Sequence, residues 1–198
     1  MILESIVTTR SQSGKTNLAP MGPLFDGNGH CFELRPFAGS QTLANLTETR
    51  QGVLHVTDDV VIFARAAIGQ LDPMPAMIDA TIIDGQVLAN ACRWYEFEVT
   101  FLQSTTSRAS IQCQIVHTGR IRDFFGFNRA KAMVIEAAIL ATRLDFLPIE
   151  EISRQYMHFE KVISKTGGGE EFEAFEMLQN YVNSCSPGFD PADPDPIR

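Results

Sequence analysis

Residues 35–45, Arg-Pro-Phe-Ala-Gly-Ser-Gln-Thr-Leu-Ala-Asn, carry the side chains best suited to bind an anion. Gly39 allows a sharp turn, and the hydroxyl groups of Ser40 and Thr42 can cap a helix that follows. The free N–H groups in the first turn of such a helix attract negative charge, and Arg35 adds a forked donor for phosphate oxygens. The stretch therefore predicts one side of a site for a ligand that carries phosphate.

The same residues also fit an ordinary helix start, with Ser40 or Thr42 as the cap and Arg35 as a surface charge. On the local pattern alone this is the more common arrangement, because many capped helices bind nothing. The pattern by itself therefore leaves both interpretations open.

Residues 17–22, Asn-Leu-Ala-Pro-Met-Gly, are expected to form the other side of the site. Residues 4–10 and 16–19 flank a turn that contains glycine, which predicts a β-hairpin. Pro20 lacks a backbone donor, so the strand pairing should break around Met21 and leave backbone groups free for a ligand.

Short strands and brief helices fill the first 120 residues. The expected strands are 31–34, 52–57, 78–83 and 87–92, with helices at 41–49 and from about 58 to 68. Such a pattern predicts a closed or nearly closed antiparallel barrel. A dinucleotide-binding sheet would need long alternating helices and a G-x-G-x-x-G turn, and this part of the sequence has neither.

A long strand pair follows at residues 94–101 and 111–115, where apolar and polar side chains alternate clearly. Glu96 and Glu98 fall on the polar side of this pattern. We expect them to form a solvated face and not an acid–base pair.

The C-terminal part changes to helical periodicity. Residues 128–148 predict an amphipathic helix of about five turns, since small apolar residues recur at steps of three and four. Residues 149–165 and 170–185 predict an αα-hairpin around a glycine-rich loop. The C-terminal quarter is predominantly acidic, most visibly at residues 170–173, which predicts a solvated face. The expected division is a barrel domain at 1–127, a helical extension at 128–186 and a flexible tail at 187–198.

Titratable residues elsewhere match no recognised catalytic or metal-binding pattern. Asp58 and Asp59 stand directly before a helix, where carboxylates act as caps. The four cysteines include no C-x-x-C pair, and the four histidines lack the spacing of metal ligands. We therefore predict no metal site.

Composition restricts the class of protein. A chain of 198 residues with 44% hydrophobic content can bury a core. The net charge of −8 argues against a nucleic-acid or anionic-membrane partner. No apolar run approaches the roughly 20 residues that span a bilayer, and the N-terminus lacks the pattern of a signal peptide. We expect a cytoplasmic protein.

Four segments in register resemble the FMN-binding split-barrel flavoproteins, specifically their flavin-reductase-like branch. The segments are Thr8-Thr9, residues 17–22, Arg35-Pro with Ser40-x-Thr42-x-x-Asn45, and residues 52–57. The chain is most similar to the DUF447 family, whose members carry a C-terminal helical extension. The resemblance implies a mainly β fold with α, namely an antiparallel split β-barrel plus a C-terminal helical subdomain.

The resemblance also implies the cofactor and its contacts. FMN phosphate and ribityl would be held by Arg35, Ser40, Thr42 and Asn45. The flavin ring would lie along Asn17, Ala19, Pro20, Met21 and Gly22, with Val56 and Thr57 approaching from the next strand. Split-barrel flavoproteins are homodimers with FMN at the interface, so a dimer is expected.

The flavin would carry the chemistry, so no catalytic side chain is expected. An FMN-dependent oxidoreductase is the first hypothesis for the function. A non-enzymatic FMN carrier or sensor that binds a partner protein, and a ligand-free structural barrel, are the alternatives.

Overall fold

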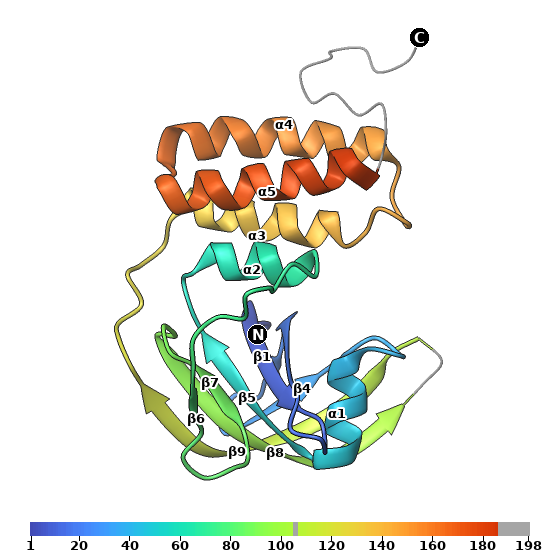
Figure 1. Cartoon of the computed structure of the whole chain (residues 1–198), viewed down its shortest axis with the longest axis vertical. Helices are drawn as coiled ribbons and strands as arrows, with labels where there is room; N and C mark the ends of the chain where they lie inside the picture. Colours follow the sequence, from blue (N-terminus) through green and yellow to red (C-terminus); the bar gives the residue numbers. More distant parts are fainter. Residues whose placement is uncertain (105–106, 186–198) are drawn as a thin grey trace. The chain divides into compact units, whose positions relative to one another are not determined.

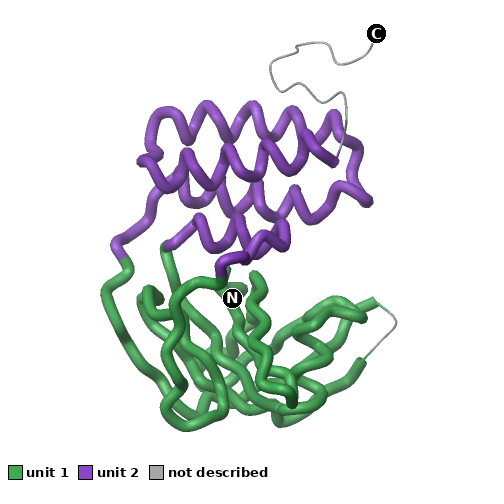
Figure 2. Tube along the Cα trace, viewed as in Figure 1, with its two compact units in different colours: residues 1–58, 74–124 green, residues 59–73, 125–198 purple. Residues whose placement is uncertain are grey.

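A computed structural model describes residues 1–104 and 107–185. The chain forms two units (Figure 2): Met1–Asp58 with Met74–Phe124, and Asp59–Pro73 with the chain from Phe125 onward. The second unit therefore includes a segment inserted between elements of the first. The domain boundaries expected from the sequence stay predictions, and the expected tail at 187–198 lies outside the described residues.

A seven-stranded antiparallel sheet builds the first unit (Figure 1). Its strands are β1 (Ser5–Arg10), β2 (Thr16–Met21), β3 (Leu24–Phe25), β4 (Cys31–Leu34), β5 (Gln51–Val56), β8 (Arg93–Ser104) and β9 (Ala109–Arg120). They follow the order β2-β1-β5-β8-β9-β4-β3. As expected, β2 ends at Met21, and the edge position lets this strand include Pro20, which cannot donate to a neighbour.

Residues 1–3 pair with β3 and so connect the far edge of the sheet to β1. The N–H of Leu3 donates to the carbonyl of Pro23 at 3.1 Å, and the N–H of Phe25 donates to the carbonyl of Met1 at 3.1 Å. The sheet thus curls back on itself around a core that includes Val7, Leu54 and Phe97. The predicted antiparallel split barrel is confirmed.

Helix α1 (Gln41–Thr49) lies against β1 and β2. Ser40 caps it, because its Oγ accepts from the N–H of Leu43 at 3.3 Å. Leu46 is fully buried and joins the barrel core. The start and end of this helix agree with the prediction of residues 41–49.

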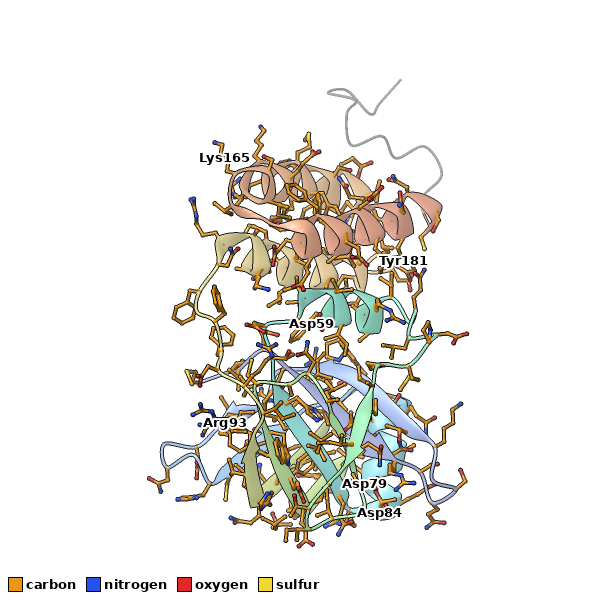
Figure 3. All side chains as sticks on the ribbon, turned by 60° about the vertical axis from the view of Figure 1, so that its left-hand side comes forward. Asp59, Asp79, Asp84, Arg93, Lys165 and Tyr181 are labelled. Atoms are coloured by element: carbon orange, nitrogen blue, oxygen red, sulfur yellow. The ribbon has the colours of Figure 1, made fainter. Side chains whose placement is uncertain are left out.

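A small hairpin, β6 (Met77–Asp79) and β7 (Gln86–Leu88), packs against β1 and β5. Asp79 and Asp84, labelled in Figure 3, belong to it and to its turn. The hydroxyl of Thr8 donates to the carbonyl of Gln86 at 2.5 Å, which ties the hairpin to β1.

Glu96 is a correction to the sequence interpretation, because its side chain is fully buried and not solvated. Its carboxylate accepts from the N–H groups of Thr81 at 2.7 Å, Ile82 at 2.7 Å and Ile83 at 3.1 Å, and from Trp94 Nε1 at 3.2 Å. The loop between β6 and β7 therefore wraps around this residue. Alternation within β8 could not reveal that covering loop.

In residues 59–73 and 125–185, the second unit contains four helices: α2 (Val60–Ala67), α3 (Arg129–Ala141), α4 (Ile149–Thr166) and α5 (Gly169–Cys185). Val60, Ala64, Ala137, Tyr156 and Phe175 contribute to one apolar core. The αα-hairpin of α4 and α5 agrees with the prediction. Helix α3 is shorter than the predicted five turns, and the chain continues beyond Ala141 in turns that contain the poor helix formers Thr142 and Asp145.

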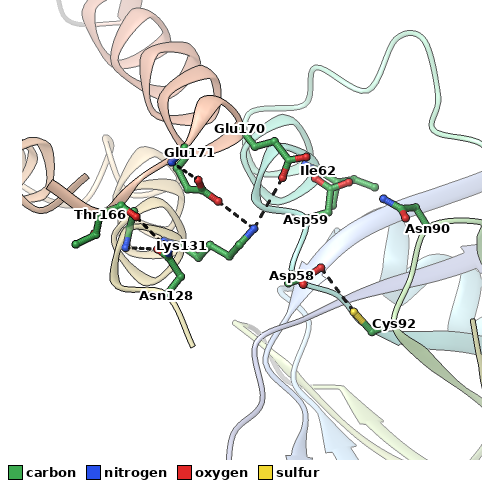
Figure 4. Close-up of polar contacts among 12 residues, drawn as sticks. Asp58, Asp59, Ile62, Asn90, Cys92, Asn128, Lys131, Thr166, Glu170 and Glu171 are labelled. Carbon is green, nitrogen blue, oxygen red and sulfur yellow. Dashed lines mark hydrogen bonds and ion pairs between the residues drawn. The ribbon is translucent and has the colours of Figure 1, made fainter. Parts of the chain in front are cut away.

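Polar contacts link the start of α3 to the loop between α4 and α5 (Figure 4). Lys131 Nζ lies 2.9 Å from Glu171 Oε1, and Glu171 Oε2 accepts from the N–H of Gly168 at 2.7 Å. Asn128 Nδ2 donates to the carbonyl of Thr166 at 3.0 Å. Glu171 is thus buried and paired, which corrects the expectation that it belongs to a solvated acidic face.

Candidate functional site

The first turn of α1 carries the donors that the sequence analysis assigned to phosphate. Helix starts leave several N–H groups without partners inside the helix. Ser40 satisfies the N–H groups of Leu43 and Ala44, but those of Gln41 and Thr42 meet no acceptor within residues 1–104 and 107–185. The turn that precedes the helix has Gly39 at φ +80°, a conformation that glycine adopts readily.

Polar side chains, of which those of Thr9, Thr42 and Asn45 are buried, connect α1 to the β1–β2 hairpin. Asn17 Nδ2 donates to Thr42 Oγ1 at 3.1 Å. Gln41 Nε2 donates to Asn45 Oδ1 at 2.7 Å, and Asn45 Nδ2 donates to Thr9 Oγ1 at 3.0 Å. Three of the predicted residues, Asn17, Thr42 and Asn45, are therefore brought together, although they come from two different elements.

The residues predicted to line a ring extend from this cluster along β2. Thr9 pairs with Asn17 and Ser5 pairs with Met21, so the two ends of the pairing lie about 13 Å apart at the rise of a β-strand. Ala19 and Met21 share the face of Asn17, because side chains alternate along a strand. Pro20 falls on the opposite face, and Gly22 follows the end of the strand.

Val56 lies at the Met21 end of this strip. It is two residues beyond Leu54, which pairs with Val7 in the barrel core, so Val56 shares the core-facing side of β5. Thr57, the next residue, is buried. The candidate residues therefore form an elongated strip with polar groups at one end and mainly apolar side chains at the other.

Arg35 is not joined to this cluster by any hydrogen bond or ion pair within residues 1–104 and 107–185. Its side chain is 43% exposed, and its Nε lies 3.8 Å from Glu33 Oε1. That same carboxylate oxygen accepts from Ser110 Oγ at 2.8 Å. Arg35, which was predicted to bind the phosphate, therefore lies beside the carboxylate of Glu33.

Arg108 is a basic residue near the loop that sequence reasoning missed. Its guanidinium carbon lies 4.3 Å from the centre of the Phe37 ring, and the two residues form an isolated β-bridge. The N–H of Ala38 also donates to the carbonyl of Ser107 at 3.1 Å. No local pattern predicts this contact, because the two segments are distant in sequence.

The aspartates before α2 have separate roles. Asp59 caps the helix, because its Oδ1 accepts from the N–H of Ile62 at 3.1 Å. Asp58 instead pairs with Arg122 at 2.5 Å and lies 3.6 Å from the Cys92 thiol (Figure 4). Burial and the charge of Asp58 raise the pKa of Cys92, which leaves this thiol protonated and unreactive.

His55 is also structural. It is fully buried on the face of β5 that the β6–β7 hairpin covers, and burial lowers its pKa to about 4. In the described part of the chain no group of three or more His, Cys, Asp or Glu side chains is arranged to hold a metal ion. No helix in residues 1–104 or 107–185 is long and apolar enough to cross a membrane.

The fold is that of a split-barrel protein of the flavin-reductase-like type. Residues 3–122 match the N-terminal domain of DUF447, a protein family of unknown function, and residues 128–180 match a second DUF447 domain. The chain belongs to the DUF447 family.

Solved structures agree with this fold. An FMN-bound DUF447 protein from Methanosarcina mazei is 26% identical, with a TM-score of 0.78 over 91% of this chain and 94% of that one. A 2-nitrobenzoate 2-nitroreductase from Pseudomonas fluorescens is 19% identical, with a TM-score of 0.53 over 60% of this chain and 65% of that one. A putative flavin reductase with a split-barrel domain from Shewanella frigidimarina is 11% identical, with a TM-score of 0.53 over 61% of this chain and 68% of that one.

Proposed function

We propose that this protein binds FMN, with the phosphate at the first turn of α1 and the flavin ring along β2 toward Met21 and Val56. One observation carries the proposal. Within residues 1–104 and 107–185, the backbone N–H groups of Gln41 and Thr42 at the helix start donate to no acceptor. The FMN-bound relative from Methanosarcina mazei, similar over nearly its whole length, supports the same ligand.

The residues present fit a phosphate group. A helix start carries a partial positive charge that favours an anion by about 0.3–1 kcal/mol near the surface. Asn17, Ser40 and Thr42 bring amide and hydroxyl groups to the same turn, and none of them is a carboxylate that would repel phosphate. At the bend, no described atom lies within 4 Å of the position where a Cβ atom of residue 39 would be.

The length of the strip fits an elongated ligand with a charged tail. Ala19, Met21 and Val56 supply apolar contacts for a planar ring, and Met21 lies about 13 Å along β2 from Asn17, which bonds to Thr42 at the helix start. When bound, FMN would supply hydride or electron chemistry through its ring. The role of this chain would be to hold the phosphate, orient the ring and limit the access of water.

We further propose that the protein is an oxidoreductase that acts on a small molecule, and that it forms a homodimer with FMN at the interface. No acid, base or nucleophile of the protein is needed for this role. The dimer is supported by the resemblance to split-barrel flavoproteins, and by the exposed Phe101 and Val116 on the long β8–β9 pair.

A visible absorption spectrum tests the proposal. The purified protein is measured as isolated and again after FMN is added and the sample is desalted. Retained flavin bands at about one per subunit would support the site, and oxidation of NADH or NADPH with a screened acceptor would support the enzyme. Bound flavin that no acceptor reoxidises would favour a carrier or sensor. A colourless protein that cannot be reconstituted would contradict FMN binding.

A further inference from the structure

The hydrogen bonds beneath α1 form two paths with defined directions. One runs from Asn17 Nδ2 to Thr42 Oγ1 over 3.1 Å. The other runs from Gln41 Nε2 to Asn45 Oδ1 over 2.7 Å, and from Asn45 Nδ2 to Thr9 Oγ1 over 3.0 Å. The second path connects the first turn of α1 to strand β1 from the exposed Gln41 through the buried Asn45 and Thr9.

Both the oxygen and the nitrogen of the Asn45 side-chain amide form hydrogen bonds in this path. The residue is buried, and its Oδ1 and Nδ2 already bond to Gln41 and Thr9 inside the protein. An amide that donates and accepts inside the protein instead fixes the distance between the two groups it joins. Asn45 was expected to touch the ligand, but its contacts suit it to hold the helix on Thr9.

Thr42 differs from Asn45 because its oxygen accepts a bond while its proton stays available. Within residues 1–104 and 107–185 no acceptor receives the Thr42 hydroxyl proton, although the residue is only 2% exposed. Because Asn17 Nδ2 donates to the Thr42 oxygen, the proton of the Thr42 hydroxyl is left to be donated to another group. The group that completes this bonding pattern must be an acceptor, such as a phosphate oxygen.

We propose that Thr9 and Asn45 are positioning residues. They hold the first turn of α1 against β1, so that the Thr42 hydroxyl and the N–H groups of Gln41 and Thr42 are directed to one phosphate. The inference rests on the proposed function, because it assigns that phosphate to FMN. It adds Thr9, which touches no ligand, and the side chain of Gln41, which bonds to Asn45, to the groups that decide phosphate affinity.

Thr8 provides a matched control on the same strand. It is as buried as Thr9, and its hydroxyl also makes one hydrogen bond, to the carbonyl of Gln86 on the opposite face of the sheet. A Thr→Val change at either position removes a hydroxyl at nearly constant volume. Only the change at Thr9 touches the path to α1.

The experiment measures Kd for FMN and for riboflavin, which lacks the phosphate, in wild type, Thr9→Val, Thr9→Ser and Thr8→Val. We expect Thr9→Val to raise the Kd for FMN about tenfold and the Kd for riboflavin less than about twofold. Thr9→Ser should restore the wild-type ratio of the two constants. Thr8→Val should lower the melting temperature and leave the ratio unchanged.

Amide hydrogen exchange supplies a readout without flavin. Exchange at residues 43–46 should accelerate in Thr9→Val and not in Thr8→Val, because only the first change loosens α1. Should Thr9→Val not fold, Gln41→Leu breaks the same path at an exposed position and should change the ratio in the same direction.

The outcomes separate the two proposals. A wild type that prefers FMN to riboflavin, with Thr9→Val keeping that preference and the wild-type exchange, would overturn the positioning role alone. A change in the ratio of equal size in Thr8→Val would overturn it as well. A wild type that binds neither flavin would contradict the proposed function, and with it the assignment of the phosphate.

Discussion

The imidazole of His55 accepts a hydrogen bond of 3.1 Å at Nε2 from the backbone N–H of Leu88. Its other ring nitrogen, Nδ1, lies 3.1 Å from the carbonyl oxygen of Ile6 and therefore carries the proton. One neutral side chain thus joins β5, β1 and the β6–β7 hairpin. Protonation of Nε2 would turn the acceptor for Leu88 into a second donor.

Acid should weaken the fold through His55. Burial lowers its folded pKa to about 4 from 6.5, so the unfolded chain binds the proton first as pH falls. The free energy of unfolding should therefore decrease as pH falls from 6.5 to about 4, by about 3 kcal/mol in total, with no such contribution to the slope above that range. Urea unfolding at a series of pH values measures this slope.

Two variants test whether His55 causes this pH dependence of stability. His55→Gln should remove this part of the pH dependence at a cost in stability at neutral pH, while His30→Gln, at an exposed position, should leave it unchanged. An unchanged slope in His55→Gln would show that another group carries it.

Glu96→Gln should destabilise the β6–β7 loop. Burial alone would raise the pKa of Glu96, but the hydrogen bonds from Thr81, Ile82 and Trp94 outweigh it and hold the pKa below the usual value. Stability from this group is present above the carboxylate's unfolded pKa and is lost as pH falls through the lower folded pKa.

The expected loss for Glu96→Gln at pH 7 is about 1–3 kcal/mol, because the amide replaces a charged acceptor with a neutral group that also carries donors. Chemical denaturation measures it. Glu98→Gln, two residues along the same strand and exposed, should change stability by less than about 0.5 kcal/mol. Equal effects in both variants would contradict the structural role of Glu96.

Thr42→Ala should weaken FMN binding by about 1–3 kcal/mol, because it removes one hydroxyl donor from a charged acceptor. Fluorescence titration of FMN measures the change. Thr47→Ala is the matched control on the same helix, since Thr47 is exposed and its hydroxyl bonds to the carbonyl of Leu43. Arg35→Ala should add a smaller loss, because Arg35 is partly exposed and lies beside Glu33. Identical affinity in Thr42→Ala and wild type would remove α1 from the site.

Gly119→Ala should disturb the packing of Trp94. A Cβ atom at residue 119 would lie 1.9 Å from Trp94 Cζ2, far closer than van der Waals contact allows. We expect a loss of about 1–3 kcal/mol or more and a shifted emission spectrum, since the chain has one tryptophan. Gly27→Ala, where nothing lies within 4 Å, should leave both unchanged. A wild-type spectrum and stability in Gly119→Ala would show that the ring moves aside without cost.

Local signals predict the elements that position the candidate site. Ser40 marks the start of α1, and alternation marks the β8–β9 pair, because capping and side-chain periodicity depend only on neighbouring residues. Contacts between distant segments could not be predicted in this way. Glu96 accepts hydrogen bonds from the loop at residues 81–83, and the buried Glu171 pairs with Lys131 from another helix.

The same limit applies to the candidate site. Asn17 and Thr42 have residue types that fit a ligand, and the sequence order of a known family suggests that they meet. That Asn45 bonds inward to Thr9, and that Arg35 lies beside Glu33, depends on how side chains orient once the sheet has closed. Spacing along the chain carries no information about those orientations.

The inserted segment that contains α2 affects the order in which the protein can fold during synthesis. Val60, Ala64 and Ile68 leave the ribosome well before α3, α4 and α5, which complete the core they belong to. Until then their apolar side chains lack those contacts, while β8 and β9, the last two strands of the barrel sheet, are being made. Domains generally fold as units as they emerge. The nascent barrel therefore carries an apolar segment whose packing partners are still missing until α3, α4 and α5 have been made.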